Sequence, residues 1–586
     1  MATRGTKKNR TQHRAPASRP ASDDYKLIFR IGLIVALGIL IYLPALSGEW
    51  LWDDRELIAD SVLIHDPDGL RKIWFEPATC LFDYMPLKVS VEWIEWRLFG
   101  EDTTGYHVVS LVLHLLSAFL LWRLLARFGL RHAWVGGLIF IVHPVLVESV
   151  AWIAELKNTL SLPFFLLAMS ALIDFDTRGK RRDYVTALIL FLLALWTKPT
   201  MVMFPFVILL YAWWKRRRIG WKDLEISLPF FAISVAIGAA TLWFLHRTPG
   251  EQAVVLGGPL SRLACAGLSI AFYFSKCVLP VNLITIYPRW IVDPPSPLQF
   301  LPWPVLAGVL WFLWTKRAGW GRYALLGLGF FLINLAPFLG LNAGSYMKYT
   351  WVMDHLLYIP IIGLIGLAVA GWEQMEAQLA VTPRRIGVGI AAVLLALMAW
   401  SSWGYAQLYS SLEGLWRYNI AVNPAAALPH NDLGVALVRK ERSAEALDEF
   451  RIATMLEPSY SDAHRNFGIS LFQAGRIAES AAEFQELVRL SPRVADAHYH
   501  LALALGSLGR TAESDDQYRQ AIALDAHYID AYNNLAVSLA EQNCAPEAIQ
   551  LLQTAVQIDP SNQQIQGNLA KLLATKSNAS TKQSQK

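Results

Sequence analysis

Long apolar runs alternate with short charged connections through the first two thirds of the chain. The first run, at residues 27–46, has about the length that a helix needs to cross the hydrocarbon of a bilayer. Ten similar runs follow, at about 106–124, 134–150, 158–174, 184–197, 200–214, 227–246, 301–315, 323–340, 356–372 and 386–403. The pattern predicts an all-α, polytopic membrane domain over residues 27–403 with about 11 spans. A cleaved signal peptide ending near Ser47 is the alternative for the first run.

Clusters of Lys and Arg predict the orientation of these spans. Residues 1–26 are basic, contain no apolar period and are expected to form a disordered cytoplasmic tail. The positive-inside rule places the later basic clusters in the cytoplasm as well. Three apolar runs lie between the clusters at 215–218 and 316–322, and their odd number conflicts with this rule. We therefore expect residues 263–279, which include Lys276, to be re-entrant or interfacial because a mid-bilayer lysine is costly. Everything after residue 404 then lies outside.

A 34-residue repeat follows the last span. Large apolar residues, small residues and prolines recur on this grid, as in the set Pro458, Pro492 and Pro560, the set Gly434, Gly468, Ala502 and Ala536, and the set Phe450, Phe484, Tyr518 and Leu552. Such spacing is typical of tetratricopeptide repeats, in which small residues let paired helices approach closely. We predict a linking helix in 404–426, four repeats in an α-solenoid at 427–562, a capping helix at 563–574 and a disordered tail at 575–586.

Composition agrees with a membrane protein that carries a soluble appendage. Of 586 residues, 54% are hydrophobic and 17% charged, and the net charge of +5 comes from basic clusters beside apolar runs. This distribution indicates membrane orientation and a lipid-bilayer environment, with no nucleic-acid partner. The four cysteines show no CxxC spacing, so neither a zinc site nor a disulfide framework is indicated.

Charged residues of several external segments are expected to meet at one membrane surface. The first external loop, 47–104, contains Trp52-Asp53-Asp54-Arg55-Glu56 and an interfacial helix at about 89–99. An adjacent acidic pair suits a general base and its partner, or a clamp for a divalent cation. The other external candidates are His143, Glu148, Glu155, Lys157, Lys198, Lys348, Asp354, His355 and the region from Lys276 to Arg289.

Each of these motifs has a plainer reading when it is taken alone. The acidic pair could be a solvated loop, residues 143–158 an interfacial turn without metal-ligand spacing, and Lys198 a lysine that snorkels to the interface. Their convergence on one face is the stronger signal, because juxtamembrane charges are costly and usually functional.

The order of several motifs resembles a known family. The chain is similar to the transmembrane and tetratricopeptide-repeat O-mannosyltransferases and their bacterial relatives in six segments. In order, these are Trp52 to Glu56, Gly105-Tyr106-His107 to His114, His143-Pro144 to Lys157, Lys198-Pro199, Tyr358-Ile359-Pro360 and the repeat tail. Those proteins belong to the GT-C glycosyltransferases, which use polyprenyl-phosphate sugars. The sequence differs from the family pattern at two places. It has Asp354-His355-Leu356 where relatives have an acidic residue, Arg and an aromatic, and it has Met85 where many have Arg.

The resemblance implies a glycosyltransferase that moves mannose or a similar sugar to a hydroxyl, such as protein Ser or Thr, on the external face. Asp53 would be the base, Asp54 would orient the acceptor or hold a cation, and Glu148 would be a supporting carboxylate. Lys198 and His355 would bind the donor phosphate, shared with Lys348 or Arg289. His143, Lys157 and Asp354 are further site candidates, and Asn431, Tyr499 and Asn533 would contact the acceptor on the repeats.

These residues require no cofactor, although the acidic pair could take a divalent cation. The expected location is a bacterial inner membrane, with a cytoplasmic N-terminus and periplasmic repeats. Two alternatives stay open from the sequence: a non-enzymatic membrane scaffold that recruits partners through its repeats, and a flippase or transporter for lipid-linked sugars.

Overall fold

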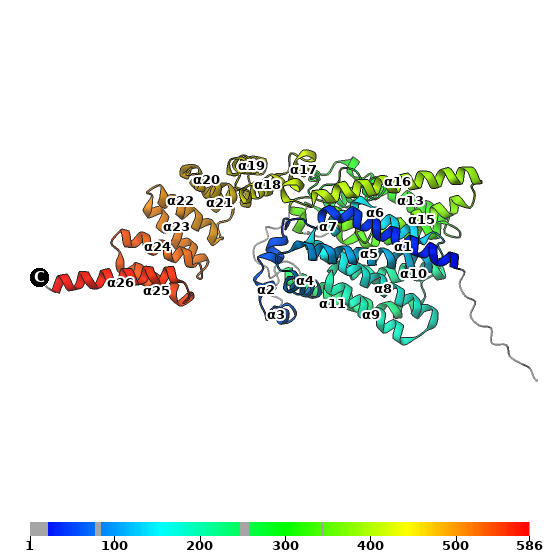
Figure 1. Cartoon of the computed structure of the whole chain (residues 1–586), viewed down its shortest axis with the longest axis horizontal. Coiled ribbons are helices and arrows are strands. Elements are labelled where there is room, and N and C mark those ends of the chain that lie inside the picture. Colours follow the sequence, from blue (N-terminus) through cyan, green and yellow to red (C-terminus); the bar gives the residue numbers. More distant parts are fainter. Residues whose placement is uncertain (1–20, 77–83, 246–256, 341–344, 585–586) are drawn as a thin grey trace, which may run out of the picture. The chain divides into compact units, whose positions relative to one another are not determined.

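The computed structural model describes residues 21–76, 84–245, 257–340 and 345–584, which form helices and no β-strand (Figure 1). These residues make two compact units. The first contains residues 1–283, 290–348 and 352–410, and the second contains residues 284–289, 349–351 and 411–586. The all-α prediction, with a membrane helical domain followed by a tetratricopeptide solenoid, is confirmed.

The first unit is a bundle of long apolar helices (Figure 1). They are α1 (Ala21–Tyr42), α5 (Thr103–Arg127), α6 (Ala133–Val142), α7 (Val147–Ala151), α8 (Leu156–Arg178), α9 (Arg181–Thr197), α10 (Phe204–Arg216), α11 (Trp221–Leu245), α12 (Pro259–Val278), α13 (Pro302–Thr315), α14 (Gly321–Leu335), α15 (Ile361–Glu376) and α16 (Val381–Leu408). Among the described residues, 7 segments are long and apolar enough to cross a membrane, or up to 8 if the bent pair α6 and α7 is one span. Segment α12 is not among them. Eleven crossings stay a prediction.

Aromatic and small residues hold this bundle together. Phe191 of α9 stacks on Phe204 of α10 with ring centroids 5.1 Å apart, and both side chains are buried. Helices α14 and α15 approach closely at Gly327 and Gly363, where a Cβ on Gly363 would lie 2.2 Å from the Gly327 carbonyl oxygen. A larger side chain at either position would push α15 away from the bundle. The segment leading into α15 carries His355, so this contact also positions a candidate site residue.

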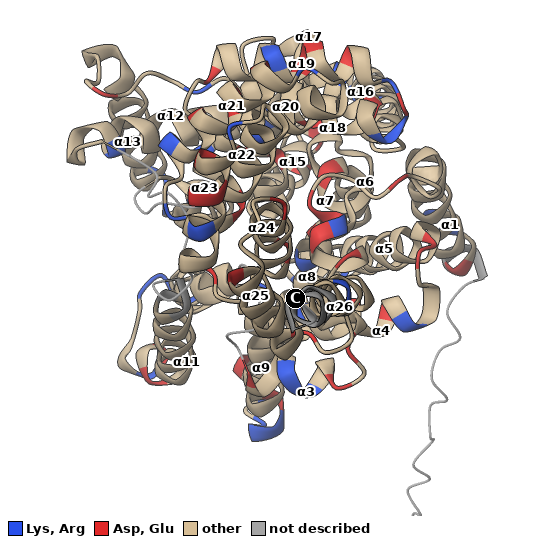
Figure 2. Cartoon of the chain, turned by 90° about the vertical axis from the view of Figure 1, so that its left-hand side faces the viewer, with Lys and Arg blue, Asp and Glu red and all other residues tan. Residues whose placement is uncertain are grey.

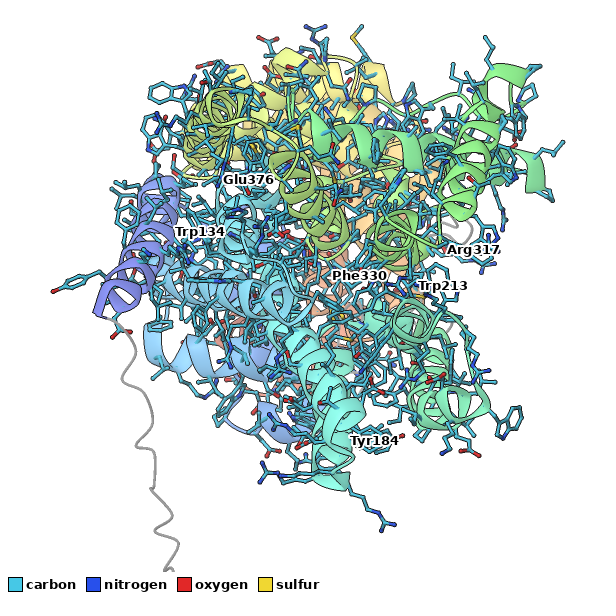
Figure 3. All side chains as sticks on the ribbon, turned by 90° about the vertical axis from the view of Figure 1, so that its right-hand side faces the viewer. Trp134, Tyr184, Trp213, Arg317, Phe330 and Glu376 are labelled. Atoms are coloured by element: carbon cyan, nitrogen blue, oxygen red, sulfur yellow. The ribbon has the colours of Figure 1, made fainter. Side chains whose placement is uncertain are left out.

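Charged pairs gather where the basic loops meet, at one end of the first unit. Arg127 bonds Asp174, His132 bonds Glu376 with 2.8 Å between Nε2 and Oε2, and Lys215 and Arg216 both pair with Asp176. Figure 3 looks at this end, with Glu376, Trp134 and Trp213 labelled. Helices α5, α8, α10 and α15 end here, so their other ends must carry the opposite loops.

The segment 47–104, predicted as the first external loop, contains short helices: η2 (Arg55–Ala59), α2 (Val62–His65), α3 (Gly69–Phe75) and α4 (Pro86–Phe99). The predicted interfacial helix at 89–99 thus begins three residues earlier, at Pro86, where proline suits the first helical turn. Residues 77–83 of this loop lie outside the described residues.

The second unit is the repeat array. After α17 (Leu412–Val422) come four helix pairs: α18 (Ala427–Arg439) with α19 (Ser443–Leu456), α20 (Ser461–Gln473) with α21 (Ile477–Leu490), α22 (Ala495–Ser507) with α23 (Thr511–Leu524), and α24 (Ile529–Glu541) with α25 (Ala545–Ile558). A Cβ on Gly434 or Gly468 would lie 2.6 Å from a ring carbon of Phe450 or Phe484, respectively. The small residues of the 34-residue grid are therefore the contact points between paired helices.

A histidine repeats on the same grid and ties each of three repeats together. His430, His464 and His498 each bond, through Nδ1, a side chain 19 residues later, at 2.6, 2.7 and 2.7 Å. Each also bonds, through Nε2, a proline carbonyl six residues earlier, at 3.2, 3.1 and 3.1 Å. The fourth repeat has Tyr532 at this position.

Three predicted boundaries differ from the structure. Helix α1 begins at Ala21, so residues 21–26 are helical, in keeping with the acidic residues that favour a helix N-terminus, while residues 1–20 lie outside the described part. The linking segment breaks between α16 and α17, where the Ser411 hydroxyl accepts a bond from Gly414 N and caps α17. The last helix, α26 (Gln563–Ser584), continues past 574, because Lys, Ala and Gln favour helix without an apolar period.

Candidate active site

The adjacent carboxylates Asp53 and Asp54 have different environments. Asp54 is fully buried, and its two oxygens accept backbone N–H bonds from Leu51 at 2.9 Å and from Ala154 at 2.8 Å. Trp52, with φ of 41°, stacks on Trp152 at 5.2 Å. Asp54 therefore connects the loop before η2 to the turn that precedes α8.

Asp53 is half-buried, and its Oδ1 has no hydrogen-bond partner. Burial raises the pKa of Asp53 to about 6, the nearby Glu155 adds to this effect, and the ammonium groups of Lys157 and Lys88 oppose it. A carboxylate with this pKa is ionised for most of the time near neutral pH and can still hold a proton, which suits a general base. Of the acidic pair, Asp53 is the residue with a carboxylate oxygen that accepts no hydrogen bond.

This difference predicts that Asp54→Asn is a stability variant. The amide nitrogen would face one of the two backbone N–H groups, so a buried donor would lose its acceptor, at a cost of about 1–3 kcal/mol in the free energy of unfolding. Asp53→Asn should change unfolding much less, because Asp53 Oδ1 accepts no bond. Chemical denaturation of the two purified variants in detergent checks this, and equal destabilisation would contradict it.

Residues 143–158 fold back between α6 and α8 and bury two carboxylates. Pro144 ends α6, and the short helices η4 (Pro144–Leu146), α7 and η5 (Ile153–Glu155) follow, with a 62° bend between the two parts of the pair. Figure 2 shows the charged positions of α7 and α4 in this unit. Glu148 and Glu155 are both buried.

His355 lies between these two carboxylates. Its backbone N–H donates to Glu148 Oε2 at 3.1 Å, its Nδ1 lies 3.5 Å from Glu148 Oε1, and its Nε2 lies 3.7 Å from Glu155 Oε1. Asn158 donates to Glu155 Oε2 at 2.5 Å and to the His355 carbonyl at 3.3 Å. Glu155 also pairs with Lys157 at 2.7 Å. The 354–360 motif and the 143–158 segment thus form one hydrogen-bonded network.

Lys198 joins this network from the loop after α9. Its ammonium group donates to Asn158 Oδ1, lies 5.4 Å from the centre of the Phe338 ring and is buried. Burial lowers the pKa of Lys198 to about 7, with Lys157 adding to the fall and Glu155 opposing it. A buried lysine of this kind gains most when an anion reaches it.

The other predicted site residues have different surroundings. In His143, Nδ1 accepts from Val145 N and Nε2 donates to the Cys277 carbonyl at 3.0 Å, so the ring connects α6 to α12. Asp354 is buried within electrostatic reach of Lys276. Lys348 ends η9 (Ser345–Lys348) and is half-buried. Arg289 belongs to the second unit, where its guanidinium lies 4.8 Å from the Trp351 ring.

The predicted acceptor residues are joints between repeats. Asn466 donates to Asn431 Oδ1 at 2.9 Å, Asn534 donates to Tyr499 Oη at 3.2 Å, and Asn568 donates to Asn533 Oδ1 at 2.8 Å. The first two bonds connect the first helices of successive repeats, and the third connects the last repeat to α26. The acceptor role stays a prediction, and any acceptor would meet side chains that already bond one another.

Sequence reasoning missed Asn158 and the inner face of α4. Asn158 lay at the end of the 143–158 motif without a role. Lys88, Glu92 and Glu95 are buried although they stand in a segment that was predicted to be an external loop. Their spacing of i, i+4 and i+7 places them on one helix face, which was the available signal.

No group of three or more His, Cys, Asp or Glu that could hold a metal ion occurs among the described residues. At the acidic pair, each oxygen of Asp54 accepts one backbone N–H bond, whereas Asp53 Oδ1 accepts none. A divalent cation at this pair stays a prediction.

A helical membrane unit with buried, paired charges is joined here to a tetratricopeptide array, and comparisons with known proteins point to the same combination. Residues 86–244 match the family described as dolichyl-phosphate-mannose-protein mannosyltransferase, and residues 431–495, 465–526 and 499–563 match tetratricopeptide repeats. The resemblance to the transmembrane and tetratricopeptide-repeat O-mannosyltransferases is thereby confirmed.

Curated relatives carry the corresponding name. A protein O-mannosyl-transferase of Caenorhabditis elegans is 23% identical over 449 residues, which cover 73% of this chain and 63% of that protein. The protein O-mannosyl-transferase TMTC3 of Homo sapiens is 23% identical over 492 residues, which cover 73% of this chain and 51% of that protein. The chain therefore spans about half to five-eighths of the length of these relatives.

Solved structures match in the repeats. The tetratricopeptide protein YrrB is 21% identical with a TM-score of 0.25, and the match covers 27% of this chain and 81% of YrrB. MamA is 17% identical with a TM-score of 0.25, and the match covers 26% of this chain and 90% of MamA.

Proposed function

We propose that this chain is a membrane glycosyltransferase that moves a sugar, mannose or a similar hexose, from a polyprenyl-phosphate donor to a Ser or Thr hydroxyl of a protein. The observation that carries the proposal is the network from Asp53 through Lys157, Glu155 and Asn158 to Lys198. In this network a half-buried carboxylate, which we propose as the base, and a buried ammonium group lie in one electrostatic neighbourhood. The family description of the match at 86–244 supports the lipid-phosphate donor.

The proposed reaction is a direct displacement at the anomeric carbon. The acceptor O–H bond breaks and its proton goes to Asp53, while the acceptor oxygen forms a bond to the anomeric carbon. The bond from that carbon to the phosphate oxygen breaks, and its electron pair leaves with the polyprenyl phosphate. Lys198 stabilises the developing phosphate charge, with His355 beside it, and Glu148 holds the His355 backbone in place.

The proposed face is external, which is the periplasm for a bacterial inner-membrane protein. The loops at the end of the first unit away from Lys198 are basic and contain Arg127, Arg131, Lys215 and Arg216. The positive-inside rule assigns basic loops to the cytoplasm. A lipid-linked donor would present its phosphate to the Lys198 end from the outer leaflet. The repeats, as the soluble appendage, would receive the acceptor polypeptide.

The test is transfer by the purified full chain in lipid nanodiscs, with labelled polyprenyl-phosphate mannose, glucose and galactose and an unfolded Ser- and Thr-rich peptide. We expect label in the peptide from one donor, released by alkaline β-elimination. No transfer from any donor would overturn the proposal and favour the scaffold alternative. Transfer from nucleotide sugars alone would overturn the lipid donor.

The pH dependence of kcat/KM should be bell-shaped. Asp53 acts as a base when ionised, so activity should rise through about pH 6, and Lys198 binds phosphate when protonated, so activity should fall above about pH 7. Lys198→Arg, which keeps its charge at high pH, should lose the fall on the alkaline side. A full alkaline fall in this variant would contradict the assignment of Lys198.

A further inference from the structure

Helix α4 has its polar face inward and its apolar face outward. Lys88, Glu92 and Glu95 are only 3%, 1% and 3% exposed, whereas Ile94 and Leu98 on the other side are 46% and 69% exposed. Apolar side chains on the outer face suit a helix that lies in the membrane interface. The inward charges are unusual, because burying a charge costs more than burying an apolar side chain of similar size.

The inner face of α4 packs on the loop that carries the acidic pair. Val89 and Trp93 contact the apolar cluster that contains Ile58, Ala59 and Ile153, which flank Asp53 and Asp54 and the turn before α8. Lys88 Nζ lies 2.5 Å from Glu92 Oε1, and the lysine is within electrostatic reach of both Asp53 and Asp54. The packing therefore places α4 beside the loop that carries the acidic pair, with the buried Lys88 at its first turn.

The charges around Asp53 come from three places. Lys157 and Glu155 face it from the start of α8, Asp54 adjoins it on its own loop, and Lys88 faces it from α4. Lys157 is already paired with Glu155. Lys88 is paired with Glu92 in the same way, so two cations, each held by a glutamate, act on Asp53.

Glu95, although close to Lys88 on the same helix face, carries no charge that would compete for the Lys88 ammonium group. Its Oε1 has no hydrogen-bond partner, and burial together with the nearby Glu92 raises the pKa of Glu95 to about 9. The side chain is therefore a neutral acid at pH 7. Since a buried ion pair is seldom more stable than apolar side chains in its place, stability alone does not account for the Lys88 and Glu92 pair.

We propose that Lys88 is a positioning residue for the transfer reaction: held by Glu92 on the inner face of α4, its ammonium group keeps Asp53 ionised and ready to take the acceptor proton. The inference rests on the proposed function, in which Asp53 is the base. Lys88 acts through Asp53 and touches neither the donor nor the acceptor.

The test is the titration of Asp53 in the purified full chain, measured as the infrared carboxyl band that is lost in Asp53→Asn. Without the Lys88 charge, the ionised form of Asp53 is less stable, so Lys88→Met should raise the titration midpoint by about one pH unit. A one-unit rise from a midpoint near the measuring pH would lower transfer at pH 6 about fivefold, with little change at pH 8. Lys88→Arg should restore the original midpoint.

Matched variants keep this test decisive. Lys72→Met removes a lysine of the same loop that pairs with Asp66, and it should leave both the midpoint and the transfer rate unchanged. Should Lys88→Met fail to fold, the double variant Lys88→Met with Glu92→Gln removes both charges of the pair and should still raise the midpoint. An unchanged midpoint in the folded Lys88 variant, or an equal rise with Lys72→Met, would overturn the inference. If the wild-type chain transferred no sugar while Lys88→Met still raised the midpoint, the proposed function would fall and the influence of Lys88 on Asp53 would stand.

Discussion

Asp53→Asn should lower kcat for sugar transfer by about two to four orders of magnitude, the usual contribution of a general base. The side chain keeps its size and loses its ability to accept a proton. Because Asp53 Oδ1 makes no hydrogen bond, the fold should persist and the KM for the donor should change little. Steady-state transfer with saturating peptide and a range of donor concentrations measures both quantities.

Asp60→Asn is the matched control for this variant. Asp60 stands in the same loop, pairs with Arg55 at 2.9 Å and is exposed, so its substitution should leave kcat within a factor of about two, as is usual for a surface change. A loss of transfer equal to that of Asp53→Asn would show that any acid in the loop matters. Full activity of Asp53→Asn would remove Asp53 from the reaction.

Lys198→Met should lower transfer by about 10²–10³-fold, the size expected when one group that stabilises transition-state charge is lost. Methionine matches the length and apolar stem of lysine, so it should remain packed beside Phe338 while the charge disappears. The KM for the lipid donor should rise as well, because the phosphate is charged before and after transfer. Kinetics with varied donor and fixed peptide separate the two effects.

Lys222→Met provides the control for this second variant, because Lys222 is exposed at the start of α11, where the chain returns from the opposite end. Its removal should alter neither constant. If Lys198→Met kept wild-type kcat and donor KM, the phosphate would have to bind elsewhere in the chain.

The sequence was sufficient to predict the repeats and to predict that residues of several separate loops meet in one candidate site. The residues that recur every 34 positions are those that pack between paired helices. The contact between Gly434 and Phe450 shows why small and large residues recur at fixed positions. The alternation of spans and basic clusters predicted that residues 143–158, Lys198 and His355 lie at the same end of the helical bundle. In the structure, Asn158 contacts both Lys198 and the His355 backbone. Periodic patterns and alternating topology are properties that a one-dimensional sequence contains.

Contacts between loops were not predictable in the same way. Neighbouring residues Asp53 and Asp54 look alike in sequence, and they differ because the Ala154 N–H, 100 residues away, reaches Asp54 alone. The inward turn of Lys88, Glu92 and Glu95 has the same origin. A mixed polar and apolar helix shows two faces in its sequence, and the neighbours of the folded chain decide which face is buried.

The central claim is that one site, with Asp53 on one side and Lys198 on the other, binds the lipid-phosphate sugar. The most direct test is a cryo-electron microscopy structure of the full-length Asp53→Asn chain in nanodiscs with the polyprenyl-phosphate sugar that supports transfer. We expect the phosphate within hydrogen-bond distance of Lys198 Nζ and the anomeric carbon facing residue 53. A donor bound at the Asp176 end, or one whose phosphate contacts neither Lys198 nor His355, would contradict it.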